Sequence, residues 1–158
     1  MALENRALGR IDGHTNYATR EFIVANGVTI NENDFVYFDG DGEITNATIG
    51  TSRLIGQALQ TVVGDDILKC LVCVDDQMLY LIDNDNDGTT FGAEHVGDYF
   101  VLTGATNAQL VDTSSTSNTL GQLLCLEYNP QVDPVKGDTS WGVYKIVNSV
   151  FAPYVANS

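Results

Sequence analysis

The stretch that decides the fold is DFVYFDGDGEITNATIGTSRLIGQALQ, residues 34–60. It begins with Phe35–Phe38, four aromatic or β-branched residues that suit a half-buried, pleated strand. Asp39–Gly42 follows with two glycines, which adopt the positive φ angles of a tight reversal without a steric clash. Ile44 and the apolar run Leu54–Leu59 then supply returning strands. The stretch therefore predicts a small β unit, and it contains no nucleophile paired with a base.

A second copy of this unit is indicated further along the chain. Asp98–Gly104 has the pattern of Asp34–Gly40, and Leu120–Leu124 has the pattern of Ile55–Leu59. The spacing between the copies is nearly the same for both matches, and a single-residue insertion reconciles the difference. Two copies are too few for a solenoid. They favour two sandwiched sheets, or two small barrels that share a core.

We therefore expect an all-β protein, a small β barrel or sandwich built from two related modules. Residues 22–24 and 28–30 are predicted to form a hairpin around Asn26-Gly27. Ile67–Val74 and Met78–Ile82 are predicted strands, and Asp112–Thr119 is a predicted polar loop. The predicted divisions are an extended N-terminal arm at 1–20, a first β module at 21–82, an acidic loop at 83–96 and a second β module at 97–158.

The chain is strongly acidic, because Asp and Glu outnumber Lys and Arg 21 to 7 and give a formal net charge of −14. A surface for nucleic acid or for an anionic membrane needs Lys and Arg to meet phosphates. The composition therefore argues against both kinds of partner. The same charge keeps copies of the protein apart until a specific surface overrides the repulsion.

The charge is unevenly distributed. Residues 1–20 carry three Arg against Glu4 and Asp12, a net of +1, so the rest of the chain carries −15. Two interpretations of residues 1–20 stay open: a frayed terminus, which most domains have, and an arm that orders on a partner. On the second interpretation the arm and the first strand bind the partner, through Arg6, Arg10, Tyr17, Arg20 and Phe22.

The sequence indicates synthesis in a reducing cytoplasm. The first 20 residues lack the apolar core of a signal peptide, and no apolar run approaches the ~18–20 residues of a transmembrane helix. The cysteines are Cys70, Cys73 and Cys125, an odd number without a disulfide framework.

One motif has the pattern of a calcium loop. Asp83–Gly88 with Glu94 satisfies D-x-[DN]-x-[DN]-G-x5-E, in which carboxylates converge on a hard cation. An EF-hand needs helices on both sides, however, and the flanking segments 78–82 and 99–102 have strand character. Asp, Asn and Gly are also the residues that hairpin loops prefer. We therefore predict an acidic loop without a metal, and keep a calcium-dependent binding module, such as a fibre or host-surface adhesin, as the alternative.

No motif supplies the roles that an enzyme needs. Cys70 and Cys73 lie three apart on a predicted strand, so their thiols point to opposite faces and do not meet; we expect buried structural cysteines. Neither His14 nor His95 stands at the spacing of a zinc site or in a catalytic motif. A glycan-active enzyme with two carboxylates from distant parts of the chain stays open as a third reading. We predict a non-enzymatic protein without a cofactor.

The residues around the first unit resemble a known family. Asn33–Phe38, Asp41–Ile44, Ala47-Thr48 and Leu54–Leu59 are similar to the core of tailed-bacteriophage capsid decoration proteins, the cement or head-stabilising proteins of the lambda type. In that family a G-D-x-V strand, a Gly-rich turn, an A-T pair and an I-G-x-A strand form a small β barrel. The resemblance covers about residues 20–75, and Asn33 stands where the family usually has Gly.

The resemblance implies a structural virion protein that binds the outside of an expanded capsid. Its partner would be the major capsid protein, and many members sit as homotrimers at three-fold positions. N-terminal arms in the family often add strands to the capsid protein beneath. A slightly basic arm on an acidic body suits such strand addition.

Overall fold

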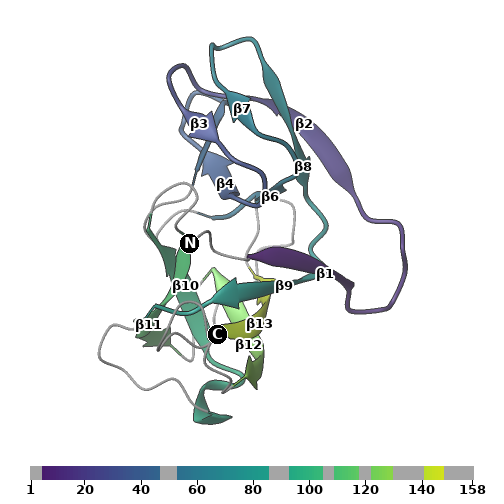
Figure 1. The fold of residues 1–158 in the computed structure, drawn as a ribbon, viewed down its shortest axis with the longest axis vertical. Helices are drawn as coiled ribbons and strands as arrows, with labels where there is room; N and C mark the ends of the chain where they lie inside the picture. Colours follow the sequence, from purple (N-terminus) through teal and green to yellow (C-terminus); the bar gives the residue numbers. More distant parts are fainter. Residues whose placement is uncertain are drawn as a thin grey trace.

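The protein is all-β, as the sequence predicts (Figure 1). The computed structural model describes residues 5–46, 53–85, 93–104, 109–117, 122–129 and 141–147. Within these ranges the only helical element is one 3-10 turn, η1 (Ala93–His95). The described strands form three sheets, and their ladders are antiparallel.

Two of the sheets lie in the upper half of Figure 1. The five-stranded sheet has the order β2 (Thr19–Ile23), β8 (Lys69–Cys73), β6 (Gly56–Ala58), β4 (Phe35–Phe38) and β5 (Ile44–Asn46). The two-stranded sheet pairs β3 (Thr29–Ile30) with β7 (Val62–Val63).

The six-stranded sheet lies in the lower half, and β1 lies where the two halves meet. Its order is β1 (Arg6–Arg10), β9 (Met78–Asp83), β13 (Trp141–Ile146), β12 (Leu123–Asn129), β10 (Tyr99–Thr103) and β11 (Leu110–Ser117).

The first part of the stretch 34–60 forms the predicted hairpin. β4 pairs with β5, and the turn between them contains Gly40 and Gly42 at φ 108° and 88°. The Asp39 N–H closes the turn on the Glu43 carbonyl at 3.0 Å. Before β4, Asn33 has a φ of 76°, a conformation that Asn adopts more readily than most residues. Asn33 therefore supplies the positive φ of the turn before β4.

Consecutive residues of β4 belong to two different hydrophobic cores. Val36 packs into a core shared by the five-stranded and two-stranded sheets, whereas Phe35 packs into the core of the six-stranded sheet. The Phe35 ring meets the Tyr80 ring edge-on, with centroids 5.1 Å apart. The same division separates two further pairs of neighbours, Leu54 from Ile55 and Cys73 from Val72. Because neighbouring strand residues face opposite sides, the centre of the five-stranded sheet is buried on both faces.

The two large sheets repeat one arrangement. The order β9-β13-β12-β10-β11 matches the order β2-β8-β6-β4-β5 strand for strand. The register agrees as well, because Val24 bridges Ile44 in parallel and Asn84 bridges Val111 in parallel. In each copy the N–H of the following residue donates to the carbonyl of that same partner, at 3.1 and 2.9 Å. The repeat that the sequence predicts is therefore a duplicated sheet.

The register corrects the alignment of the two copies. Phe35 pairs with Gln57, and its counterpart Tyr99 pairs with Leu124. The counterpart of Gln57 is thus Leu124 and not Gln122, which the sequence pattern selects. A shift of two positions leaves every side chain on the same face of the sheet. Both alignments therefore place the side chains on the same faces, so the Gly-Gln pair that occurs in both copies does not reveal the two-residue shift.

Two predicted local elements are wrong. Residues 22–24 and 28–30 do not form a hairpin, because β2 pairs with β8 and β3 pairs with β7. Gly27, with φ 77°, does make a turn between them, but the flanking strands enter different sheets. The first part of Asp112–Thr119, the predicted polar loop, belongs to β11. A strand rich in Ser and Thr is tolerated there because β11 is an edge strand and because Thr favours extended backbone.

The sheets also divide the chain differently from the predicted modules. Met78–Asp83 falls mostly within the predicted first module, but β9 pairs with β1 and β13 in the six-stranded sheet. Residues 6–10, predicted as part of an extended arm, form β1. The sequence pattern does not reveal this strand because a bulge between Ala7 and Gly9 interrupts its alternation.

Replacing Phe35 by Ala should lower the free energy of unfolding by about 3–5 kcal/mol, because the ring is fully buried in the core of the six-stranded sheet. Phe38→Ala is the matched control, since Phe38 is half-buried and packs against the other core. Denaturant unfolding followed by far-UV circular dichroism measures both variants. Equal losses would contradict the role of Phe35 in joining the two large sheets.

Candidate interaction site at the N-terminal strand

β1 is one of the two edge strands of the six-stranded sheet. Asn5 anchors its start, because its Nδ2 donates to the Gln109 carbonyl at 2.6 Å and its Oδ1 accepts the Asp83 N–H at 2.9 Å. One backbone edge of β1 pairs with β9, and the other edge faces no strand among the described residues. That edge presents a row of backbone donors and acceptors, which is a template for a further strand.

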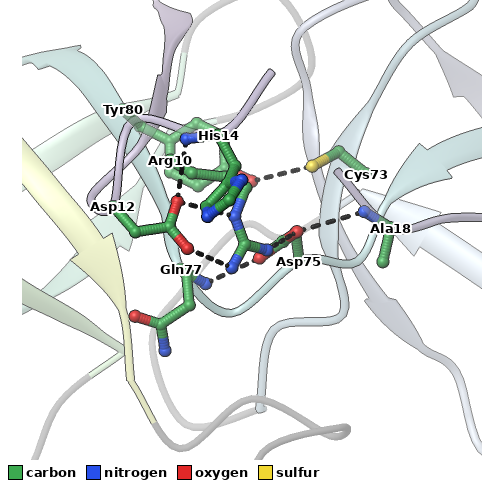
Figure 2. Close-up of polar contacts among 8 residues, drawn as sticks. All are labelled: Arg10, Asp12, His14, Ala18, Cys73, Asp75, Gln77 and Tyr80. Atoms are coloured by element: carbon green, nitrogen blue, oxygen red, sulfur yellow. Dashed lines mark hydrogen bonds and ion pairs between the residues drawn. The ribbon is translucent and has the colours of Figure 1, made fainter. Parts of the chain in front are cut away.

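β1 ends at Arg10, whose guanidinium lies between two carboxylates (Figure 2). Its Nε and one terminal nitrogen donate to the two oxygens of Asp12 at 3.0 and 2.8 Å, and the other terminal nitrogen pairs with Asp75. The buried Asp75 also accepts the N–H groups of Ala18 and Gln77, at 3.1 and 2.9 Å. This one carboxylate therefore ties together the end of β1, the loop before β2 and the turn before β9.

Hydrogen bonds within the cluster lower the pKa of both carboxyl groups. For Asp12 the largest cause is the hydrogen bond from Arg10, followed by the His14 N–H. For Asp75, burial acts in the opposite direction, but backbone N–H groups and the guanidinium outweigh it and lower its pKa. The same bonds raise the pKa of Arg10. All three groups are therefore charged, and Arg10 is committed to internal partners.

A pocket of about 470 Å³ lies between β1, the loop 13–17 and the five-stranded sheet. We call it the arm pocket. Leu59, Cys73 and Met78 give it an apolar floor, and exposed His14 and Tyr17 form part of its wall. The pocket therefore suits an apolar side chain that is flanked by polar groups.

The five predicted partner-binding residues are only partly brought together. Arg10 and Tyr17 both line the arm pocket. Arg6 is exposed on β1, and Arg20 is exposed on β2 in the other large sheet. Phe22 is half-buried and stacks edge-on with an aromatic neighbour. Of the five, Arg6, Tyr17 and Arg20 have the exposure that a partner requires.

The sequence analysis did not identify the large apolar side chains that are exposed to solvent. Leu8 and Ile11 are 46% and 53% exposed beside the β1 edge. Val63, at the end of β7, and Ile67 and Leu68, before β8, are 60%, 75% and 51% exposed. The sequence predicts Ile67 and Leu68 to lie in a strand, but β8 begins at Lys69. The two aspartates that precede them were the available signal, because Asp favours turns.

Half of the predicted acidic loop, residues 86–92, lies outside the described residues. Of its described part, the Asp85 Oδ1 accepts the N–H and the hydroxyl of Thr113, at 2.9 and 2.7 Å. The Asn84 Oδ1 accepts the Tyr144 hydroxyl. These oxygens therefore accept hydrogen bonds from within the fold. Across the described ranges, no group of three or more His, Cys, Asp or Glu side chains is arranged to hold a metal ion.

The cysteines are buried and free, as predicted. Cys70 and Cys73 point into different cores, which confirms that the two thiols lie on opposite faces of their strand. Burial raises the pKa of both thiols and raises that of Cys125 to about 11. Thiols with raised pKa values are poor nucleophiles and poor metal ligands.

No protein-family model matches the chain, and no curated protein matches it. None of the helical structure in the described ranges is long and apolar enough for a membrane span. The class of the protein therefore rests on its own geometry. That geometry is an all-β body whose exposed features include an unpaired strand edge, a pocket with an apolar floor and a loop with apolar side chains.

Asp75→Asn should weaken the attachment of β1, because it removes the charge that holds Arg10 and two backbone N–H groups. The loss should be about 1–3 kcal/mol of unfolding free energy. Asp76→Asn is the matched control, since the Asp76 side chain makes no hydrogen bond or ion pair with a described residue. Denaturant unfolding and amide exchange of residues 6–10 measure the effect. Equal results for the two variants would show that the cluster does not hold the strand.

Acid should loosen β1 through the same cluster. The folded pKa values of Asp12 and Asp75 are lowered, so the unfolded chain binds more protons. The stability they contribute is complete above the unfolded pKa of about 4 and is lost as the pH falls through the folded values. Amide exchange of residues 6–10, compared with β12 between pH 7 and 2.5, measures this. Parallel changes in the two strands would contradict the assignment.

Proposed function

We propose that the protein is a structural virion protein that binds the outer surface of a tailed-phage capsid and stabilises the shell. The observation that carries the proposal is the outer edge of β1, which pairs with no described strand and lies next to exposed Arg6, Leu8 and Ile11. The resemblance of residues 33–59 to capsid decoration proteins supports the same assignment. In that family, N-terminal segments often add strands to the capsid protein.

Strand addition is the mode of binding that this edge favours. A capsid strand paired with β1 would gain backbone hydrogen bonds, and alternate side chains would give specificity. Electrostatics support the use of this region, because residues 1–20 carry a net charge of +1 while the remainder carries −15. The remainder of the chain would on average bring more negative charge to the shell.

On this proposal the partner is the major capsid protein, and the protein acts on the capsid exterior after synthesis in the host cytoplasm. It is not an enzyme and needs no cofactor. Homotrimers at three-fold positions would use one modest patch three times. Linked binding of this kind strengthens attachment without a larger contact area.

The test is co-sedimentation with expanded, undecorated shells of the source phage. The wild-type protein should bind saturably, at a ratio set by the three-fold positions. The double variant Arg6→Glu with Ile11→Asp should bind at least about tenfold more weakly, or about 1.4 kcal/mol. Point variants are preferable to deletion of residues 1–20, because that deletion removes β1 and the start of β2.

Lys69→Glu with Val96→Asp is the matched control. It reverses one exposed cation and charges one exposed apolar residue, both away from β1. The control should bind as the wild type does. Equal binding by the two double variants would overturn the assignment to the β1 edge. Failure of the folded wild-type protein to bind expanded shells would overturn the decoration role itself.

A further inference from the structure

The first half of β2 is an exposed sheet edge. β2 is an edge strand of the five-stranded sheet and pairs there with β8 (Figure 1). Val24, just beyond the end of β2, bridges Ile44 of β5, so the edge is covered at that end. Residues 19–21 are exposed, and no described strand lies along their outer side. Such an edge presents backbone donors and acceptors to which a further strand can add.

The outward backbone groups of this edge belong to Thr19 and Glu21. The Val74 N–H donates to the Ala18 carbonyl at 3.0 Å, so Ala18 faces the β8 side. Residues of an antiparallel strand direct their N–H and carbonyl groups to the two sides alternately. Thr19 and Glu21 therefore direct both groups away from β8. Within the described part of the chain these groups have no hydrogen-bond partner.

The duplicated sheet shows what such an edge can hold. β9 is the counterpart of β2, and Val24 and Asn84, which make the matching bridges, are equivalent positions. Residues 19–21 therefore correspond to residues 79–81. On β9 that segment pairs with residues 6–9 of β1 in an antiparallel ladder. The strand position that β1 fills on β9 has no described occupant on β2.

The equivalence extends to the direction of the backbone groups. The Ile11 N–H donates to the Gln77 carbonyl at 2.8 Å, and the Asp83 N–H donates to the Asn5 Oδ1 at 2.9 Å. Odd-numbered residues of β9 therefore face β1, and the outward-facing residues of β2 are also odd-numbered. A strand added to β2 would meet the same backbone groups that β1 meets on β9.

Side chains restrict which strand can add. Arg20 is exposed and has no ion-pair partner in the described ranges, and Glu21 is exposed on the other face of the strand. Charges on an edge strand oppose indiscriminate pairing. Two β2 strands paired in the register of greatest overlap would place Arg20 opposite Arg20, and like charges directly opposite are destabilising. The edge therefore fits a different segment, with an acidic residue opposite Arg20 and none opposite Glu21.

We propose that the β2 edge accepts an extended segment of the shell protein, antiparallel to β2 and with a carboxylate opposite Arg20. The inference rests on the proposed function for the identity of this partner. β1 ends at Arg10 and β2 begins at Thr19, so at most about 32 Å of chain joins the two edges. With a shell strand on each edge, the second attachment would be intramolecular. One molecule would then tie two segments of the shell together, which accounts for stabilisation as well as attachment.

Amide hydrogen exchange of the wild-type protein tests the edge without a substitution. In the free protein the N–H groups of Thr19 and Glu21 should exchange much faster than those of Arg20 and Phe22, which face β8. On saturated shells the Thr19 and Glu21 N–H groups should exchange at least about tenfold more slowly. Mass spectrometry with fragmentation to single residues measures both states. Unchanged exchange of these two groups on shells would overturn the proposal.

Glu21→Pro tests the same edge by removing one outward donor. The β8 ladder does not use this N–H, and proline is tolerated on an edge strand where the N–H would face solvent. Glu21→Thr is the matched control, because it loses the same charge but keeps the N–H. In co-sedimentation, Glu21→Pro should bind shells at least about tenfold more weakly than Glu21→Thr. Shells decorated with Glu21→Pro should also dissociate at a lower temperature.

The outcomes separate this inference from the proposed function. Failure of the wild-type protein to bind shells would overturn both. Binding by the wild type, with equal affinities for Glu21→Pro and Glu21→Thr, would overturn the β2 edge alone. Self-association of the free wild-type protein that Glu21→Pro abolishes would replace the shell segment by a second copy. If circular dichroism shows that Glu21→Pro is unfolded, the exchange measurement on the wild-type protein decides.

Discussion

The structure depends on the burial of both faces of β4. Phe35 and Val36 are neighbours on one strand, yet each is fully buried in a different core. A strand buried on both faces has no solvent side, so its register cannot slip without moving each side chain into the wrong core. The contact of Phe35 with Tyr80 then couples the five-stranded sheet to the six-stranded sheet. The two copies of the repeated sheet consequently share the core that contains Phe35 and Tyr80.

The duplication explains why similar strands have different surroundings. Phe35 and Cys73 of the first copy correspond to Tyr99 and Lys145 of the second, by the register of their strands. The first pair is buried against the six-stranded sheet, whereas the second pair is half-buried. The polar groups of Tyr99 and Lys145 suit that position because they keep access to water. The copies have thus diverged where their neighbours differ.

The acidity of the chain has a structural use beyond solubility. A short carboxylate accepts backbone N–H groups that a loop leaves without partners. Asp34 caps the turn before β4, Asp65 and Asp66 shape the exposed loop at residues 63–68, and Asp75 ties the loop after β1 to the body. Sequence reasoning treats paired aspartates as solvated faces, because the backbone groups they bind are visible only in the fold. The exposed loop at residues 63–68 and the loop beside the arm pocket are both held by such carboxylates.

The sequence by itself determined the local features. The all-β class, the β4–β5 hairpin and the opposite orientation of Cys70 and Cys73 follow from residue alternation and turn chemistry over a few residues. Tertiary structure alone decided that β1 pairs with β9 and that Ile67 and Leu68 face solvent. It also decided which residues meet in the arm pocket. The physical reason is that a strand of given pattern satisfies its hydrogen bonds beside many partners, and burial across distant segments selects among them.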